Sequence, residues 1–190
     1  NWFLNIKRKN NNWKEYHSKG GGIMFNYVCH TIYYMEFLFG KIKSTKSNIS
    51  WGIKKNINSL NSIIFFESGL SAKLDIRIAS KKFISKPTHQ LKILSERCIF
   101  LLRSNVSSLF DQFEVSKINK SPKKYLDKTK LLFKNKTSNM EFRINPTYRN
   151  SKKFSSSILN EKKQKPNFSD ARRIHFIIDQ MILSSKVKRE

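Results

Sequence analysis

The chain has 190 residues, of which 38 are Lys or Arg and 13 are Asp or Glu, so its formal net charge at pH 7 is +25. An excess of this size makes a folded molecule repel itself and indicates a polyanionic partner. Nucleic acid is the first candidate, because basic residues spread along the chain bind phosphates without reading a base sequence. The charge therefore favours a component of a ribonucleoprotein over a regulator.

The composition points to an A/T-rich genome. Asn, Lys, Ile, Phe and Ser are the commonest residues, whereas the chain has six Gly and four Pro. We expect an organellar protein on this ground, mitochondrial or alternatively plastid, and an A/T-rich bacterium or a parasite nuclear genome remains open. The two cysteines, Cys29 and Cys98, do not have the spacing of a metal site, so we expect them to be buried thiols. We expect no metal and no cofactor.

Residues 1–66 are expected to form a basic region of helices and loops, with Trp2, Trp13 and Trp51 as packing anchors. A Gly20–Gly22 run predicts a loop and not a phosphate cradle, since no P-loop pattern follows it. The most apolar stretch, 23–39, contains Asn26, His30 and Glu36, and its apolar residues recur at helical spacing. We predict a buried amphipathic helix there and no membrane span.

Residues 67–116 are predicted to form a compact module. The segment 73–83 is expected to be a short helix with Leu74 and Ile78 inward and with Lys73, Arg77 and Lys81 on a neighbouring face. A second helix would start at Pro87 behind an N-cap at Ser85 and end near Arg97. Cys98–Leu102 predicts a buried strand, Arg103–Asn105 a turn, and Val106 and Phe110–Val115 further strands.

Residues 117–190 are predicted to form a basic extension, and its segment 117–165 is expected to become ordered against RNA. A helix is predicted over Ile174–Leu183, with Ser169 as its cap and Asp170 in its first turn.

The middle module resembles the RNA-binding module of the small-subunit ribosomal protein S-four family. The family's Arg-Leu-Asp opening is matched by Lys73-Leu74-Asp75, and the end of its first helix by Phe83. Its second helix is matched by Ile93-Leu94-Ser95 and its strand by Ile99, and the whole match needs no gap. Met140–Tyr148 is similar to a stretch near the end of mitochondrial members. The sequence departs from the pattern at Lys86-Pro87, at 90–92 and at the turn 101–103.

The resemblance implies an α+β fold, with a helical N-terminal region, a small S-four-type module of two helices on a small sheet, and an extended basic C-terminal region. It implies a structural role in the mitochondrial small ribosomal subunit, with small-subunit ribosomal RNA and neighbouring ribosomal proteins as partners and no small-molecule substrate. Lys73 and Lys92 match family positions, and Lys86 and Arg97 flank the second helix. The exposed face expected from the residues adds five more RNA-binding candidates, namely Arg77, Lys81, Lys82, His89 and Arg103.

The sequence also bears on whether the protein is an enzyme. Enzymes can carry a similar RNA-binding module, but the flanking regions offer no nucleotide-binding signature and no catalytic constellation of specific spacing. We therefore expect a protein that is not an enzyme. The open alternatives are a lineage-specific organellar ribosomal or RNA-scaffold protein without this module, and a basic peripheral subunit of an organellar membrane complex.

Overall fold

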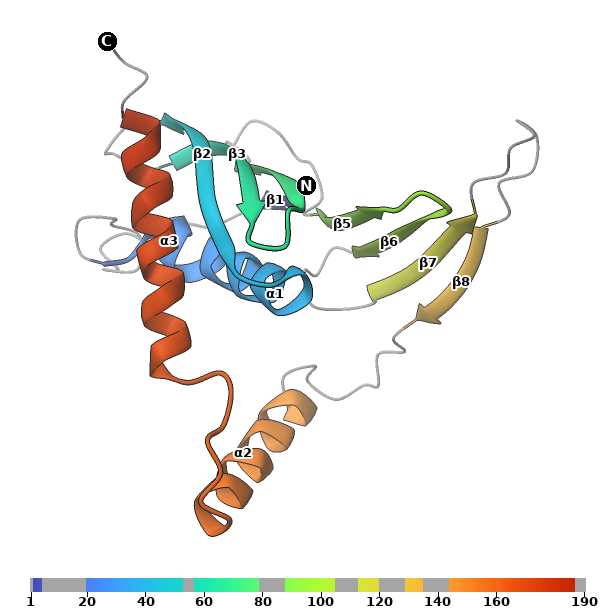
Figure 1. Cartoon of the computed structure of the whole chain (residues 1–190), viewed down its shortest axis with the longest axis vertical. Helices are drawn as coiled ribbons and strands as arrows, with labels where there is room; N and C mark the ends of the chain where they lie inside the picture. Colours follow the sequence, from blue (N-terminus) through green and yellow to red (C-terminus); the bar gives the residue numbers. More distant parts are fainter. Residues whose placement is uncertain are drawn as a thin grey trace. The chain divides into compact units, whose positions relative to one another are not determined.

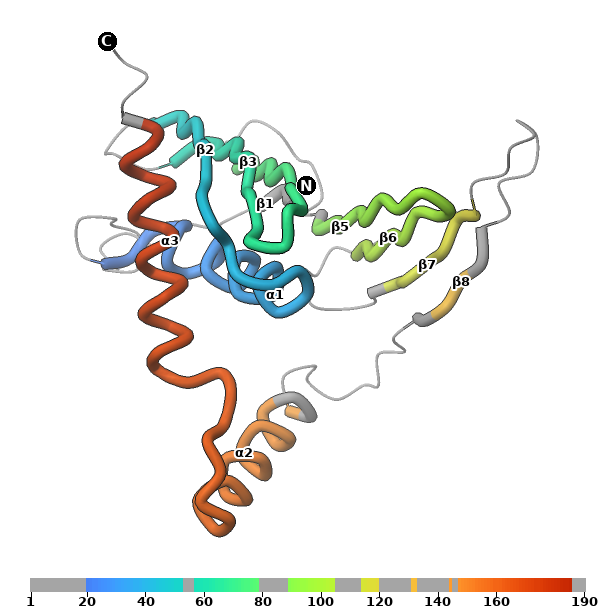
Figure 2. Tube along the Cα trace, in the orientation of Figure 1, coloured from blue at the N-terminus to red at the C-terminus, as the bar shows by residue number. Residues whose placement is uncertain are grey.

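A computed structural model describes residues 2–4, 20–52, 57–78, 88–104, 113–119, 129–134 and 144–186. Figures 1 and 2 show the described elements along the chain. Contacts divide the chain into two units. The helix–sheet unit comprises Ile6–Lys82 and Lys165–Glu190, and the strand unit comprises Asn1–Asn5 and Phe83–Gln164. The three-part division of the chain made from the sequence stays a prediction.

The helix–sheet unit contains a π-helical turn η3 (Met24–Val28), helix α1 (Cys29–Phe39), strands β2 (Ile42–Trp51), β3 (Ile57–Phe66) and β4 (Ser71–Ile78), and helix α3 (Phe168–Lys186). The three strands form an antiparallel sheet in the order β2-β3-β4. Strand β3 alternates between buried Leu60, Ser62, Ile64 and Phe66 and the residues between them, as expected when one face is covered.

Helix α3 runs beside β2 in this unit (Figure 1). Its buried residues recur at helical spacing, namely Ile174, Ile177, Ile178, Met181 and Ile182. On η3 and α1, the buried residues are Met24, Val28, Thr31, Ile32 and Met35. The core of the unit is therefore made by these two helical surfaces and the inner faces of β2, β3 and β4.

The strand unit contains β1 (Trp2–Leu4), β5 (Thr88–Leu94), β6 (Cys98–Ser104), β7 (Phe113–Asn119), β8 (Thr129–Lys134) and helix α2 (Ile144–Leu159). Its strands are antiparallel neighbours in the order β1-β5-β6-β7-β8. Helix α2 is solvent-exposed along most of its described length, including Phe154 and Leu159.

The helix predicted over 23–39 is present as η3 and α1. Likewise, α3 contains the helix predicted over Ile174–Leu183. The cap of α3 differs from the expected Ser169. Asn167 Oδ1 accepts hydrogen bonds from the N–H groups of Ser169 and Asp170 at 2.9 and 3.1 Å, and the Asp170 carboxylate accepts the Asn167 N–H at 2.9 Å. This reciprocal pairing is a capping box, in which the capping side chain precedes the helix.

The predicted fold class is wrong at its centre. Both expected helices of the S-four-type module are strands where the structure describes them, β4 over 71–78 and β5 over 88–94. The N-terminal region expected to be helical contains β2 and β3. A spacing of four residues is in phase with both a helix and a strand, so Lys73 and Arg77 share a face in either structure. The decisive residue is Ile76, which a helix would turn outward and which is fully buried in β4.

The strand assignment can be tested at Ile76. Replacing this fully buried side chain by Ala should lower the free energy of unfolding by about 2–5 kcal/mol, because the change leaves a cavity in the core. Ile63→Ala is the matched control on the neighbouring strand, where 46% of the side chain is exposed, and it should cost less than about 1 kcal/mol. Chemical denaturation measures both. Equal effects would contradict the burial pattern of the sheet.

An ion pair joins three elements of the helix–sheet unit. The guanidinium of Arg173 in α3 donates to the Glu36 carboxylate of α1 through Nε at 3.0 Å and Nη2 at 2.8 Å. The same Nη2 donates to the Ile42 carbonyl at 3.1 Å, and the Ile42 N–H donates back to Glu36 at 2.8 Å. Hydrogen bonding to Glu36 raises the pKa of Arg173. The pair therefore fixes the end of α1, the start of β2 and the first turns of α3.

Replacing Glu36 by Gln should lower the free energy of unfolding by about 1–3 kcal/mol, because Arg173 and the Ile42 N–H would lose a charged acceptor. Asp179→Asn removes the same charge from an exposed position on α3 and should change stability by less than about 0.5 kcal/mol. Thermal unfolding of the two variants separates the local contact from the change in net charge. A Glu36→Gln protein as stable as the control would show that the pair contributes nothing.

Candidate functional site

The helix–sheet unit carries an irregular turn at the start of its first helix. The Cys29 N–H donates to the Met24 carbonyl, five residues back, where an α-helix would use Phe25. The Phe25 carbonyl accepts the Cys29 thiol instead, at 2.9 Å. Burial raises the pKa of Cys29, which keeps the thiol protonated as a donor, although neighbouring backbone N–H groups act in the opposite direction. Turns of this kind occur often at functional sites.

The turn presents a polar and aromatic surface opposite the buried face of the helix. We call it the His30 surface, and it consists of Asn26, His30, Tyr33, Tyr34 and Phe37. His30 is exposed, Phe37 is 78% exposed, and the other three are half-buried. These residues recur at spacings of three and four, so they lie along one side of η3 and α1. Among the described residues, the His30 side chain has no hydrogen-bond or ion-pair partner.

The groups on this surface suit a small hydroxylated ligand. An imidazole is the side chain best suited to transferring a proton near neutral pH, and an amide or a phenol can orient a hydroxyl group. Burial raises the pKa of Tyr34, so this phenol remains a neutral donor. Within the described residues no three His, Cys, Asp or Glu side chains are arranged to hold a metal ion. The surface is therefore equipped for proton transfer.

The sequence pattern places Asn26 and His30 on a helix, where they argue against a membrane span, but it does not single out this surface as a site. The usable signal was their spacing of four residues, directly after the Gly20–Gly22 loop and off the apolar stripe. In the described part of the chain no helix is long and apolar enough to cross a membrane.

The nine residues predicted to bind RNA do not lie together on two adjacent helices. Lys73 and Arg77 are exposed on β4, where Arg77 pairs with Asp75 at 3.4 Å. Lys92 is on β5 and Arg103 on β6, and Arg103 pairs with Glu114 at 3.4 Å. Arg97 lies in the turn between these strands, and His89 is half-buried on β5. Lys81, Lys82 and Lys86 lie outside the described residues.

Within the strand unit, the register of β5 and β6 brings two members of this set to one face. Gln90 is opposite Arg103 and Lys92 is opposite Leu101, so Lys92 and Arg103 project from the same side of the strand unit. His89 is opposite Ser104 and belongs to the other side. The role of the nine residues as a binding set stays a prediction, and the two helices on which it was built are absent where the structure describes these segments.

His89 was expected to point outward, but burial lowers its pKa to about 4. The unfolded chain therefore binds more protons than the folded chain between about pH 4 and 6.5. The contribution of this histidine to stability is present above pH 6.5 and is lost as the pH falls toward 4.

We expect the free energy of unfolding to decrease from pH 7 to pH 4, and the decrease to be smaller in His89→Gln, because glutamine does not titrate. His175→Gln, at an exposed histidine, should keep the wild-type slope. Urea titrations at several pH values measure the slopes. A wild-type slope in His89→Gln would exclude the buried imidazole as its cause.

Comparisons with solved structures agree on the fold. Levoglucosan dehydrogenase in complex with NADH and levoglucosan has a TM-score of 0.73 and 13% identity, over 98% of this chain and 55% of that protein. Biliverdin reductase from Synechocystis sp. PCC 6803, solved with biliverdin and NADP+, has a TM-score of 0.70 and 9% identity, over 97% of this chain and 53% of that protein. UDP-N-acetylglucosamine 3-dehydrogenase from Acidithiobacillus ferrooxidans has a TM-score of 0.69 and 8% identity, over 98% of this chain and 52% of that protein.

At these identities the similarity establishes the fold alone. The chain spans just over half the length of these solved proteins. The sequence matches no curated protein significantly. A family model does match residues 3–190, and it is described as the oxidoreductase family, C-terminal alpha/beta domain.

This match overturns four interpretations of the sequence. The resemblance to ribosomal protein S-four is wrong, because it covers only a short module, whereas the family match runs over nearly the whole chain. The ribosomal function, the expectation of no enzyme, and the partner assignment of ribosomal RNA without a small-molecule substrate depended on it and are also wrong. The ribosomal and membrane-complex alternatives receive no support either. The chain belongs to the oxidoreductase family, as its C-terminal α/β domain.

Proposed function

We propose that the chain is the substrate-side domain of an NAD(P)-dependent dehydrogenase or reductase that acts on a small hydroxyl or carbonyl compound. The family match supports the reaction class, and the solved neighbours include proteins crystallised with NADH or NADP+. The observation that carries the proposal is the His30 imidazole beside Asn26 at the irregular turn, which is exposed and has no partner within the described residues. It gives the domain a proton-transfer group at a surface that a ligand can reach.

The described residues do not fit a dinucleotide. Such cofactors bind where a parallel strand leads through a Gly-rich turn into a helix. All the described strand pairs here are antiparallel, and the Gly20–Gly22 run has no G-x-G-x-x-G spacing. The nucleotide therefore requires a further segment or chain. In the solved neighbours, the matched region is likewise only about half of the protein.

Proton transfer is the part of the reaction that this domain can supply. Oxidation of an alcohol removes a proton from oxygen as well as a hydride from carbon. His30 would take the proton from the hydroxyl, and Asn26 would orient the same group by a hydrogen bond. In the reverse direction, protonated His30 would donate to the carbonyl oxygen.

The test is nicotinamide-linked turnover by the domain together with its nucleotide-binding part, measured against a panel of sugars, polyols and ketones. His30→Gln should lower kcat about 100-fold or more, because general acid–base catalysis contributes about that much. Stability should hardly change, since His30 is exposed.

His175→Gln is the matched control, because His175 is exposed on α3 and its ring contacts Phe25 at 5.1 Å between centroids. It should keep kcat within about twofold. A His30→Gln enzyme with wild-type kcat would refute the role of this residue. The absence of nicotinamide-linked turnover with every compound in the panel would count against the reaction class.

A further inference from the structure

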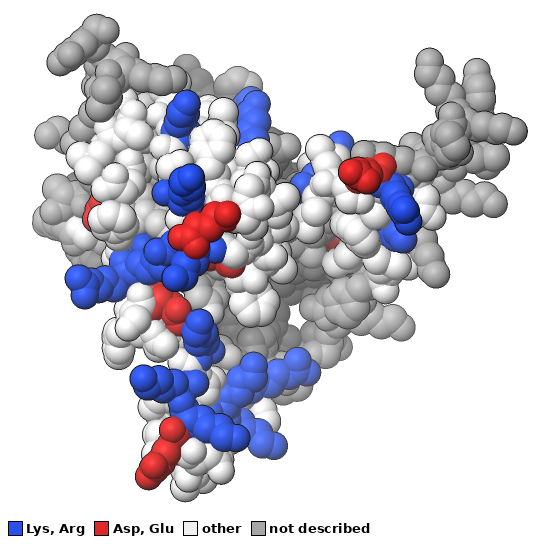
Figure 3. Space-filling view, viewed as in Figure 1, with Lys and Arg blue, Asp and Glu red and all other residues white. Residues whose placement is uncertain are grey.

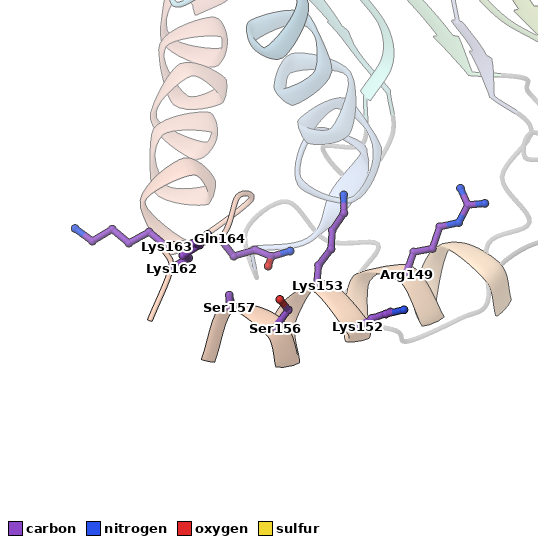
Figure 4. Close-up of a pocket in the computed structure, with 8 residues that line it drawn as sticks. All are labelled: Arg149, Lys152, Lys153, Ser156, Ser157, Lys162, Lys163 and Gln164. Carbon is purple, nitrogen blue, oxygen red and sulfur yellow. The ribbon is translucent and has the colours of Figure 1, made fainter. Parts of the chain in front are cut away.

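A basic hollow lies against α2 and the segment that follows it, within the strand unit (Figure 4). Its volume is about 610 Å³. In the space-filling view, Lys and Arg side chains gather over α2, at the bottom of Figure 3. Five of the lining residues are basic and none is acidic; the basic ones are Arg149, Lys152, Lys153, Lys162 and Lys163.

The helix and its C-terminal cap together create this concentration of charge. Arg149, Lys152 and Lys153 are three and four residues apart, so they share one face of α2. The helix ends where Glu161 takes a φ of 53° and the Lys162 N–H donates to the Ser157 carbonyl at 3.0 Å. This turn reverses the chain and brings Lys162, Lys163 and Gln164 to the same hollow.

The chain does not neutralise this charge itself. In the part that the structure describes, none of the five basic side chains forms an ion pair, and the nearest acid in sequence, Glu161, does not line the hollow. Like charges four residues apart, such as Arg149 and Lys153, destabilise a helix. An anion bound in the hollow would remove that repulsion.

A hydroxyl donor also faces the hollow. Ser155 and Ser157 donate their hydroxyl hydrogens to the helix carbonyls of Ser151 and Phe154, at 3.1 and 2.7 Å. Ser156 differs, because its Oγ accepts a hydrogen bond from Asn160 Nδ2 at 3.2 Å. Its own hydrogen has no acceptor among the described residues. The one lining serine whose hydrogen is uncommitted can therefore donate to a ligand.

We propose that this hollow binds a small anion that carries two or more phosphate charges, the chemistry shared by pyrophosphate and phosphorylated sugars. Lys and Arg side chains bind phosphate oxygens through charge-assisted hydrogen bonds. The volume is that of a small-molecule site. No aromatic residue lines it, so it offers no stacking surface for a base, and Ser156 and Gln164 suit phosphate or sugar oxygens.

The test is calorimetric titration of the whole chain with pyrophosphate, and separately with fructose 1,6-bisphosphate. We expect saturable binding of one equivalent of at least one probe, and the tighter probe identifies the source of the phosphate groups. Lys152→Gln/Lys153→Gln should weaken that binding at least about tenfold, because two charged contacts are lost. Lys152→Arg/Lys153→Arg should restore it to within about threefold.

A charge-matched control guards against unspecific attraction to a chain of net charge +25. Lys43→Gln/Lys92→Gln removes two exposed lysines from β2 and β5. It should change the affinity less than about twofold, since neither lysine lines the hollow and exposed charges are screened by salt. Equal weakening by the control and the hollow variant would overturn the proposal. So would the lack of saturation with both probes at millimolar concentration, including a result in which only a long polyanion such as an RNA oligonucleotide binds.

Discussion

The contact between Glu36 and Arg173 holds together segments that are far apart in the sequence. Glu36 is 13% exposed and Arg173 36% exposed, so the pair is shielded on one side and its charges are only partly screened. The pair also satisfies the backbone N–H and carbonyl of Ile42, at the point where the chain leaves α1 through Gly40 and enters β2. The pair therefore links the start of β2 to both α1 and α3.

This arrangement has a consequence for the candidate site. The end of α1 is fixed by Glu36, and its buried face is fixed by Ile32 and Met35. The irregular turn at the start of the helix shifts the hydrogen-bonding pattern by one residue, and the Cys29 thiol satisfies the Phe25 carbonyl that this shift leaves over. His30 therefore lies on a rigid element with its ring exposed, as a proton-transfer group requires.

The net charge of +25 predicted a polyanionic partner, and a ribosomal protein was the wrong conclusion from it. Net charge is an argument about solubility and unspecific attraction and does not determine a fold. In the structure, the basic side chains are not gathered on two adjacent helices as expected. Arg77 and Arg103 pair with carboxylates on their own or a neighbouring strand, whereas the basic side chains of α2 have no such partner among the described residues.

The sequence by itself determined helices α1 and α3, because their apolar residues recur at helical spacing over a long segment. It also determined the strand beginning at Cys98, from a short run of apolar residues. It did not determine β4 and β5, where basic and apolar residues four apart satisfy both periods. Only the tertiary structure decided those segments, because pairing Leu74 with Ser62 and Ile76 with Leu60 buries both residues on one face of β4, whereas the predicted helix would expose Ile76. The exposure of His30, the Glu36–Arg173 contact over 137 residues and the hollow at α2 were likewise decided by the fold, since each depends on neighbours that local patterns do not specify.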